Sequence, residues 1–264
     1  MTVLIFLGIF SLVGGLIWAI IYVGQKRTAD LQAVAQQLRL QFSPRGDDSI
    51  APLLANLELF DYGQGKVSNL MRGQVTRNSQ PITVAIFDYQ YTIGADRDYT
   101  NVNYEQEAVS VSSHSNVECF SQTVLVFYDE SINLPGFNLR PERLMDKMAN
   151  LVGIEDINFR DFPVFSNRYR LDAVDVSAIR DLFQPNLIKF YESHKIRTEA
   201  IGSSMVILPL GHPTSQRTRQ YGDVTFTESD LIQPSEVKSH LDLGLRLLNM
   251  MEKNLTEQHS AVRN

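Results

Sequence analysis

The segment "PITVAIFDYQYTIG", residues Pro81–Gly94, decides the fold. Successive side chains of a strand point to opposite faces, so the series that begins at Ile82 faces one way and the series that begins at Ala85 faces the other. Both series are apolar over part of the segment, which predicts an interior strand. The segment "KVSNLMRGQVTR" (66–77) precedes it across "NSQ" (78–80), and this arrangement predicts a β-hairpin.

The rest of the chain supplies further strands and several helices. We expect a long polar loop over residues 94–118 and find no internal repeat. The other predicted extended segments are residues 119–130, 157–159, 166–171, 196–210 with a turn at Gly202 and Ser203, and 224–226. The predicted helices cover residues 49–57, 141–153 starting at Pro141, 175–194 with a break before Pro185, and 235–255. The expected fold class is α+β, a largely antiparallel sheet packed with helices, preceded by one N-terminal transmembrane helix.

The N-terminal region carries the signal for membrane insertion. Residues 2–23 contain no charged side chain over 22 positions, and a helix of that length covers the ~30 Å hydrocarbon core of a bilayer. A cleaved signal peptide needs a basic leader, a shorter apolar run and a small-residue processing site, and the sequence has none of these. We therefore expect an uncleaved, single-pass signal-anchor that contacts the lipid bilayer through residues 2–23.

The orientation follows from the flanking basic residues. Lys26, Arg27 and Arg39 all follow the predicted span, and no Lys or Arg precedes it. Because Lys and Arg near a span stay on the cytoplasmic side, we expect the N-terminus outside and the C-terminal domain in the cytoplasm. Cys119 is the one cysteine, so no intrachain disulfide can form and no oxidising compartment is implied.

A small-residue pattern within the span raises the question of self-association. Ser11, Gly15 and Ala19 recur every four residues and share one helix face, a pattern that lets two membrane helices approach closely. Homodimerisation is one interpretation. The other is that small residues are simply common in membrane helices.

The chain divides into three parts. Leu31, Val34, Leu38 and Phe42 repeat at helical spacing before Pro44, which predicts an amphipathic helix directly after the span. The predicted division is a transmembrane helix at 2–23, a juxtamembrane amphipathic helix and linker at 24–46, and one cytoplasmic α+β domain at 47–264.

Composition and charge exclude some partners. With 44% hydrophobic and 20% charged residues, the chain has enough apolar material for a folded core. The net charge of -6 lies outside the span and repels phosphate backbones, so we expect no nucleic acid partner. Short basic stretches such as residues 217–220 and 195–197 fit a solvated loop or a strand edge.

Candidate chemical sites each have a simpler structural explanation. "GQGKVS" (63–68) lacks the first Gly and the Ser or Thr of a P-loop. His114 and Cys119 could form a thiol–imidazole pair but have no evident orienting group. The five histidines have no metal-ligand spacing; they are His114, His194, His212, His240 and His259.

The acidic and aromatic residues also have structural explanations. Glu155 with Asp156, or Asp172 with Asp175, could act as general acid and base, but capping and solvated turns explain them more simply. The aromatic set can line a ligand cleft or fill the core, and we expect core packing; its members are Phe159, Phe162, Phe165 and Tyr169. "NLT" at Asn254 matches a glycosylation acceptor, which a cytoplasmic position would make irrelevant. No catalytic, cofactor-binding or metal-ligating residue is assigned, and no cofactor is expected.

Several phrases of the sequence occur together in a familiar order. They are "FDYQYT", "SQTV", "LPGFNLRPE", "GIEDINF", "FPVFSNRYRL", "IRDLFQPNLIKF" and "EAIGSSMVI". Their order resembles a family of uncharacterised bacterial single-pass membrane proteins with an N-terminal hydrophobic segment and a cytoplasmic α+β domain. The resemblance implies that fold and membrane placement and brings no catalytic residues. The polar loop at 94–118 is longer than the pattern requires.

Two functions from different classes are compatible with these observations. The first is a membrane-anchored, noncatalytic binding or scaffold module with an unidentified membrane protein partner. The alternative is a membrane-bound enzyme, such as a hydrolase, whose site is assembled from residues distant in sequence. A concave pocket with convergent titratable side chains would favour the enzyme.

Overall fold

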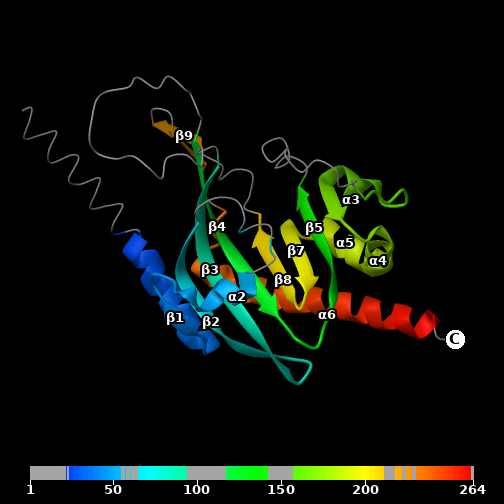
Figure 1. Cartoon of the computed structure of the whole chain (residues 1–264). Helices are drawn as coiled ribbons and strands as arrows, with labels where there is room; N and C mark the ends of the chain where they lie inside the picture. The colour runs from blue at the N-terminus through cyan, green and yellow to red at the C-terminus, as the bar shows by residue number, and fades with distance from the viewer. Residues whose placement is uncertain are drawn as a thin grey trace, which may run out of the picture.

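The computed structural model shows an α+β fold with a largely antiparallel sheet and packed helices, as expected from the sequence (Figure 1). The predicted span at residues 2–23, with Ser11, Gly15 and Ala19, lies outside the described residues apart from Tyr22. Among the residues that the structure describes, no helix is both long and apolar enough to cross a bilayer. The structure describes residues 22, 24–54, 57, 60, 65–93, 117–141, 157–210, 218–221, 224–227 and 230–262.

The sheet is built mostly from antiparallel neighbours. Its strand order is β1-β2-β3-β4-β8-β7-β5-β6, and β10 adds to β4 in parallel and pairs with β9. The strands are β1 (Gln41–Ser43), β2 (Lys66–Arg77), β3 (Gln80–Ile93), β4 (Val117–Tyr128), β5 (Leu134–Pro141), β6 (Tyr169–Ala173), β7 (Ile196–Gly202), β8 (Ser204–Pro209), β9 (Thr218–Tyr221) and β10 (Val224–Thr227).

The predicted central hairpin is confirmed. β2 and β3 pair over most of their length, and β3 lies between β2 and β4 as an interior strand. The connecting residues Asn78 and Ser79 have φ angles of 49° and 68°, the left-handed backbone that a tight hairpin turn needs. β2 has a bulge between Ser68 and Met71, and Asn69 within this bulge has a φ angle of 52°.

Two predicted helices contain residues that belong to strands. The helix after the predicted span ends at residue 38, and Phe42 belongs to β1, which pairs with β2. Arg39 adopts φ 58° and ends the helix without a glycine, so the apolar spacing continues past the true boundary. Pro141 ends strand β5 and does not begin a helix, while the other residues of that predicted helix, 142–153, lie outside the described residues.

The cap at Asp175 and the break before Pro185 are as predicted, whereas α3 (Pro163–Arg168) covers residues 166–168, which were predicted to be extended. Asp175 caps α4, since its Oδ1 accepts a hydrogen bond from the Ala178 backbone N–H at 2.9 Å. The chain breaks before Pro185, which begins α5. The helices are one over residues 24–38, η1 (Asp48–Ile50), α2 (Ala51–Leu54), α3 (Pro163–Arg168), α4 (Val176–Leu182), α5 (Pro185–Ser193), η5 (Pro234–Glu236) and α6 (Val237–Val262).

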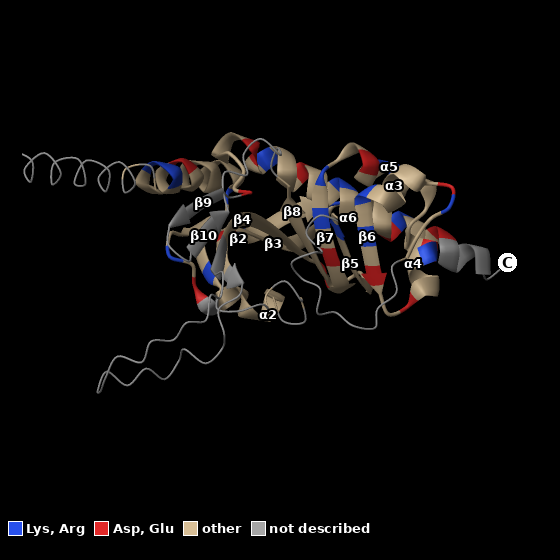
Figure 2. Ribbon diagram, turned by 90° about the horizontal axis from the view of Figure 1, so that it is seen from above, with Lys and Arg blue, Asp and Glu red and all other residues tan. Residues whose placement is uncertain are grey.

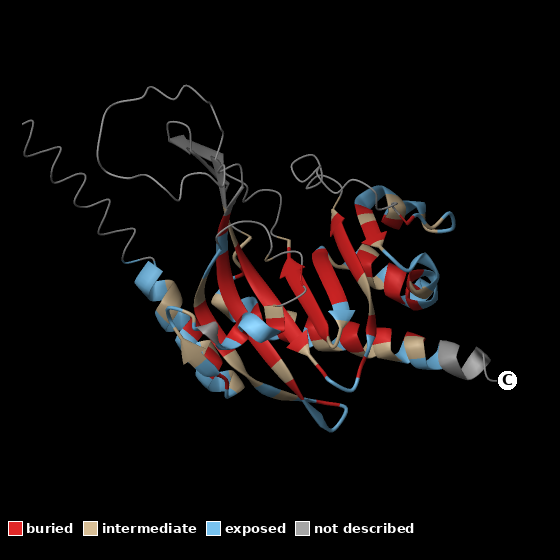
Figure 3. Ribbon diagram, viewed as in Figure 1, coloured by how far each residue is buried: buried red, intermediate tan, exposed pale blue. Residues whose placement is uncertain are grey.

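The two faces of the sheet are covered differently (Figures 1 and 3). The first face, which carries Ile82, Val84 and Ile86, packs against the helix of residues 24–38, α6 and α3 to α5. A Cβ atom at Gly244 would overlap the Phe127 ring, so glycine allows α6 to approach the sheet closely. The second face, which carries Ala85 and Phe87, packs against η1 and α2.

The helix of residues 24–38 belongs to the same core as the sheet. Leu31 and Ala35 are 1% and 0% exposed and lie in the main apolar cluster. The segment predicted to be a juxtamembrane amphipathic helix and linker, 24–46, therefore packs into the same core as residues beyond 47. The blue helix in Figure 1 lies against β1 and β2.

Arg27 fixes the start of this helix to the first face of the sheet. Its Nε and Nη2 donate to the two oxygens of Asp88 at 2.9 and 2.7 Å, a bidentate ion pair. Its Nη1 donates to the carbonyl of Ile232 at 2.8 Å. Asp88 also accepts from Asn69 Nδ2 at 2.8 Å and from Thr123 Oγ1 at 3.0 Å. Strands β2, β3 and β4 and the segment before α6 thus converge on one guanidinium.

We expect Arg27→Met to destabilise the fold by about 3 kcal/mol, because it leaves the buried Asp88 carboxylate without its charge partner. Lys26→Met is the matched control, because Lys26 is exposed and its replacement removes the same positive charge next to the predicted span. Urea denaturation of the full chain in detergent measures both variants. Equal losses of stability in the two variants would contradict the role assigned to Arg27.

A second buried ion pair joins the hairpin to α6. Arg77 donates to Asp129 Oδ2 at 2.5 Å and to Glu252 Oε2 at 2.8 Å. Burial alone would raise the pKa of Asp129, but hydrogen bonds from Ser131 and Arg77 outweigh it and hold that pKa below the ordinary carboxyl value.

The pKa of Asp129 is lower in the folded state than in the unfolded state, where it is about 3.9. The contribution of Asp129 to stability is therefore present above its unfolded-state pKa and is lost as the pH falls through its folded-state pKa. We expect Asp129→Asn to be less stable than wild type at pH 7, with a difference that shrinks below about pH 4. Denaturation measured across this pH range tests it, with the exposed Asp161→Asn as control. A difference that stays constant on acidification would refute the assignment.

Candidate functional site

Three neighbouring strands carry matching polar tripeptides: "NLR" (138–140) on β5, "RLD" (170–172) on β6 and "RTE" (197–199) on β7. β5 lies between the other two and is antiparallel to both. Asn138 pairs with Asp172 on one side and with Glu199 on the other. Arg140 pairs with Arg170. Because alternate residues share a face, the register produces an acidic row beside a basic row.

These rows lie on the second face of the sheet, opposite the helices. Arg197 and Glu199 alternate with Ile196, Thr198 and Ala200, of which Ile196 and Ala200 belong to the helix-covered core. Figure 2 shows basic and acidic positions alternating along β6 and β7. The polar side chains are nonetheless buried: Arg140 is 2% exposed and Asp172 5%. Buried charges of this kind require partners.

Asp172 holds two of the arginines. Its Oδ2 accepts from Arg140 Nη2 at 2.7 Å, and its Oδ1 accepts from Arg170 Nε at 2.6 Å. Both carboxylate oxygens are therefore hydrogen-bonded to cations. This arrangement suits a structural counter-ion that positions guanidinium groups.

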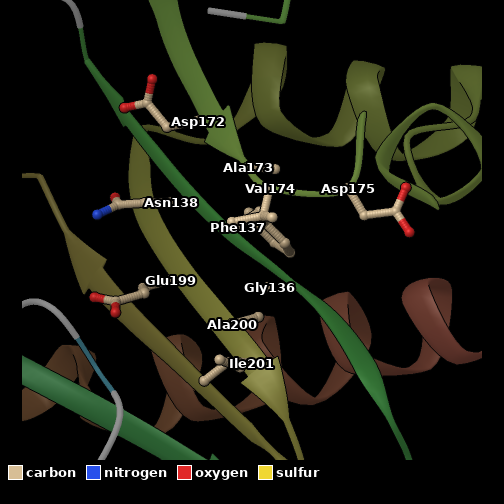
Figure 4. Close-up of a pocket in the computed structure, with 10 residues that line it drawn as sticks. All are labelled: Gly136, Phe137, Asn138, Asp172, Ala173, Val174, Asp175, Glu199, Ala200 and Ile201. Carbon is tan, nitrogen blue, oxygen red and sulfur yellow. The ribbon is translucent and has the colours of Figure 1, made fainter. Parts of the chain in front are cut away.

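A pocket of about 290 Å³ lies beside the acidic row (Figure 4). Asn138, Asp172 and Glu199 line one side, and the remaining lining is apolar except for Asp175. Val174 and Ile201, which are 94% and 42% exposed, mark the side that meets solvent. The full lining is Gly136, Phe137, Asn138, Asp172, Ala173, Val174, Asp175, Glu199, Ala200 and Ile201.

Arg140 is not among the residues that line this pocket, but its Nη2 donates a hydrogen bond to Asp172, which is. Its Nε and Nη1 are buried and have no hydrogen-bond partner within the part of the chain that the structure describes. The two rows contain three arginines and two carboxylates, and Asp175 also lines the pocket. The pocket lining itself contains three carboxylates and no Lys or Arg.

Aromatic rings cover the neighbouring part of the second face. Tyr89 stacks on Tyr91 with ring centroids 5.4 Å apart, and Tyr91 stacks on Phe120 at 5.3 Å. Burial raises the pKa of Tyr91, and the positive charge of Arg197 partly offsets that rise. Tyr91 therefore lies close enough to Arg197 for that positive charge to act on its hydroxyl group.

The fold and the site define an α+β domain with a buried polar sheet face. No protein-family model, curated protein or solved structure matches the chain. The resemblance to a family of uncharacterised bacterial membrane proteins stays a prediction.

The structure brings together one of the two acid pairs considered from the sequence. Asp172 and Asp175 line the same pocket, but Asp172 pairs with arginines and Asp175 caps α4. The predicted capping role of Asp175 is confirmed. Glu155 and Asp156 lie outside the described residues, as do His114 and the side chain of Cys119.

The aromatic set divides between core and surface. Phe165 and Tyr169 are 0% and 2% exposed, which confirms core packing for these two. Phe159 and Phe162 are half-buried and line a shallow hollow that Arg180 borders. The Arg180 guanidinium carbon lies 5.5 Å from the centre of the Phe159 ring.

His194, His240 and Asn254 each contact a backbone carbonyl oxygen. His194 Nδ1 lies 2.8 Å from the Phe190 carbonyl, and His240 Nδ1 lies 2.9 Å from the Glu236 carbonyl. Among the described residues, no cluster of three or more metal-ligating side chains occurs. Asn254 is 2% exposed and its Nδ2 donates to the Leu182 carbonyl at 2.9 Å, so the nitrogen of the "NLT" motif is buried.

Sequence reasoning missed Arg140, Arg197 and Glu199. A signal for them exists in the three tripeptides, each of which places polar side chains two residues apart. That spacing is typical of a strand with a polar face. Only the pairing of the strands shows that the three tripeptides form one surface.

We expect Asp172→Asn to lower the free energy of unfolding by about 3 kcal/mol, because two buried or half-buried arginines lose their counter-charge. Asp175→Asn is the matched control and should change stability by less than about 0.5 kcal/mol, since Asn also caps helices. Urea denaturation measures both. Similar effects of the two substitutions would contradict the counter-ion role of Asp172.

Proposed function

We propose that this protein is a membrane-anchored, noncatalytic binding or scaffold module. In this proposal residues 2–23 cross the bilayer once, with the N-terminus outside and the C-terminal domain in the cytoplasm. The observation that carries it is the position of the helix of residues 24–38. This helix begins directly after the proposed span, and Arg27 and Leu31 attach it to the sheet.

This attachment has a consequence for a bilayer-bound domain. A flexible linker would let the domain sample many orientations, whereas this helix, which follows the proposed span, is packed into the core. Confinement at the membrane raises the effective concentration of the domain toward other membrane components. An unidentified membrane protein is therefore the partner that we propose.

The pocket beside Asp172 and Glu199 favours the second candidate, a membrane-bound enzyme such as a hydrolase. Catalysis by an acid–base pair needs carboxyl groups available to the substrate. Both oxygens of Asp172 accept hydrogen bonds from arginines, and Oδ1 of Asp175 accepts one from a backbone N–H. We therefore place the noncatalytic module first.

Other parts of the proposal follow from the sequence. A homodimer through Ser11, Gly15 and Ala19 is one interpretation of their shared helix face, and the ordinary abundance of small residues in membrane helices is the other. The net charge of -6 supports a partner other than nucleic acid. Membership of the uncharacterised bacterial membrane protein family is also part of the proposal.

Membrane vesicles that contain the full chain test the anchor and its orientation. We expect the chain to stay with the lipid after alkaline carbonate extraction. Protease should digest the domain in inverted vesicles and leave it intact in sealed vesicles of native orientation.

Opened vesicles of native orientation are the control, since protease then reaches both sides. Release of the chain by carbonate or salt would overturn the anchor. Digestion in sealed vesicles of native orientation would overturn the cytoplasmic placement and leave the anchor standing.

A further inference from the structure

We propose that one end of the sheet contacts the headgroup layer of the bilayer and gives the domain a second membrane contact beside the span. This distal end of the sheet consists of residues 91–93 of β3, residues 117–120 of β4, and the strands β9 and β10. The inference rests on the proposed function, because it takes residues 2–23 as the span, and it adds the surface of the domain that faces lipid.

The helix of residues 24–38 and strand β3 are aligned along one direction. Near the start of the helix, Arg27 donates to Asp88 of β3. Just after the helix, Leu40 lies against Gly73 of β2, which pairs with Val84 of β3. The C-terminal end of β3 therefore points the same way as the N-terminal end of the helix. In Figure 1 the strand labelled β9 lies above the first described turns of the blue helix, whose N-terminal end also points upward.

The sheet extends further in this direction than the helix does. Four residues separate Arg27 from Val23, the last residue of the proposed span, which is a rise of about 6 Å in a helix. Five residues separate Asp88 from Ile93, the last residue of β3, which is a rise of about 16 Å in a strand. An inclination of about 45° between strand and helix reduces this reach to about 12 Å. The headgroup layer on each side of a bilayer is only about 5–7 Å thick, so the distal end reaches it.

The composition of the distal end suits the headgroup layer. β10 pairs with β4 from Val117 to Cys119, and β9 pairs with β10, so these two strands widen this end of the sheet. The charged residues of the distal end are Glu118 and Arg219, which have opposite signs. Its aromatic residues are Tyr91, Phe120, Tyr221 and Phe226. Tyrosine is enriched at membrane–water interfaces, where its ring lies at the level of the headgroups.

The opposite end of the sheet is polar. The turn between β2 and β3 contains Asn78 and Ser79, and β4 is followed by Asp129, Glu130 and Ser131. Glu130 is exposed. The contrast between the two ends supports the distal end as the one that meets lipid.

The contact does not require anionic lipid. The charges of Glu118 and Arg219 cancel, and residues 94–116, which connect β3 to β4, contain four acidic residues and one basic residue. Attraction to anionic headgroups needs a cluster of Lys and Arg, which this part of the sequence lacks. Aromatic and apolar side chains therefore make the contact.

Fluorescence quenching in vesicles tests the contact with the full chain. A small fluorophore is attached to Cys119, or to Thr225→Cys in a Cys119→Ala background; both positions lie in the distal end. Glu130→Cys in the same background is the matched control, since about 36 Å of strand separates residues 119 and 130. Phosphatidylcholine with a nitroxide on its headgroup is the quencher. We expect the labels at 119 and 225 to lose at least about half of their fluorescence and the label at 130 to lose less than about a tenth.

Two results would overturn this inference and leave the anchor standing. One is equal quenching at residues 119, 225 and 130. The other is no quenching at residues 119 and 225 in a chain that stays with the lipid after carbonate extraction. Release by carbonate would overturn the anchor, and this inference with it. Replacing about a fifth of the phosphatidylcholine with phosphatidylserine should not strengthen the quenching, and a contact that requires phosphatidylserine would contradict the assignment to aromatic and apolar side chains.

Discussion

The bidentate pair between Arg27 and Asp88 is the contact on which the arrangement of the domain depends. Asp88 lies in the interior strand β3, and Asn69 and Thr123 from both neighbouring strands donate to its carboxylate. Arg27 adds two hydrogen bonds to it and a third to the Ile232 carbonyl. A charge buried in this way is tolerated because every oxygen is paired. Four parts of the chain, far apart in sequence, therefore have one preferred arrangement.

The two faces of the sheet differ in how their side chains are packed. The first face is committed to the core, where the helices bury its apolar side chains. The second face combines an aromatic part on β3 and β4 with paired rows of charge on β5, β6 and β7. Buried ion pairs contribute little net stability compared with apolar packing. The charges of these rows are paired with one another, since Asp172 accepts hydrogen bonds from both Arg140 and Arg170.

Local patterns predicted the parts of the fold that short-range physics controls. The hairpin, the break before Pro185 and the α6 stripe follow from alternation, proline geometry and helical spacing. Strand β5 was missed because Pro135 and Gly136 weaken its local β signal, and pairing on both edges makes it a strand. The candidate site needed the register of residues 138, 172 and 199, which no local pattern contains. Of these three residues, only Asp172 belongs to an acid pair that the sequence suggests.

The central claim is that the helix of residues 24–38 holds the sheet rigidly at the proposed membrane anchor. Spin labels at exposed positions Asp30 and Glu130, in a chain in which alanine replaces Cys119, allow their separation to be measured in lipid bilayers by pulsed electron resonance. The account predicts one narrow distance distribution that broadens when Asp88→Leu removes the partner of Arg27. A broad distribution in the otherwise unaltered chain, or a narrow one that Asp88→Leu leaves unchanged, would contradict it.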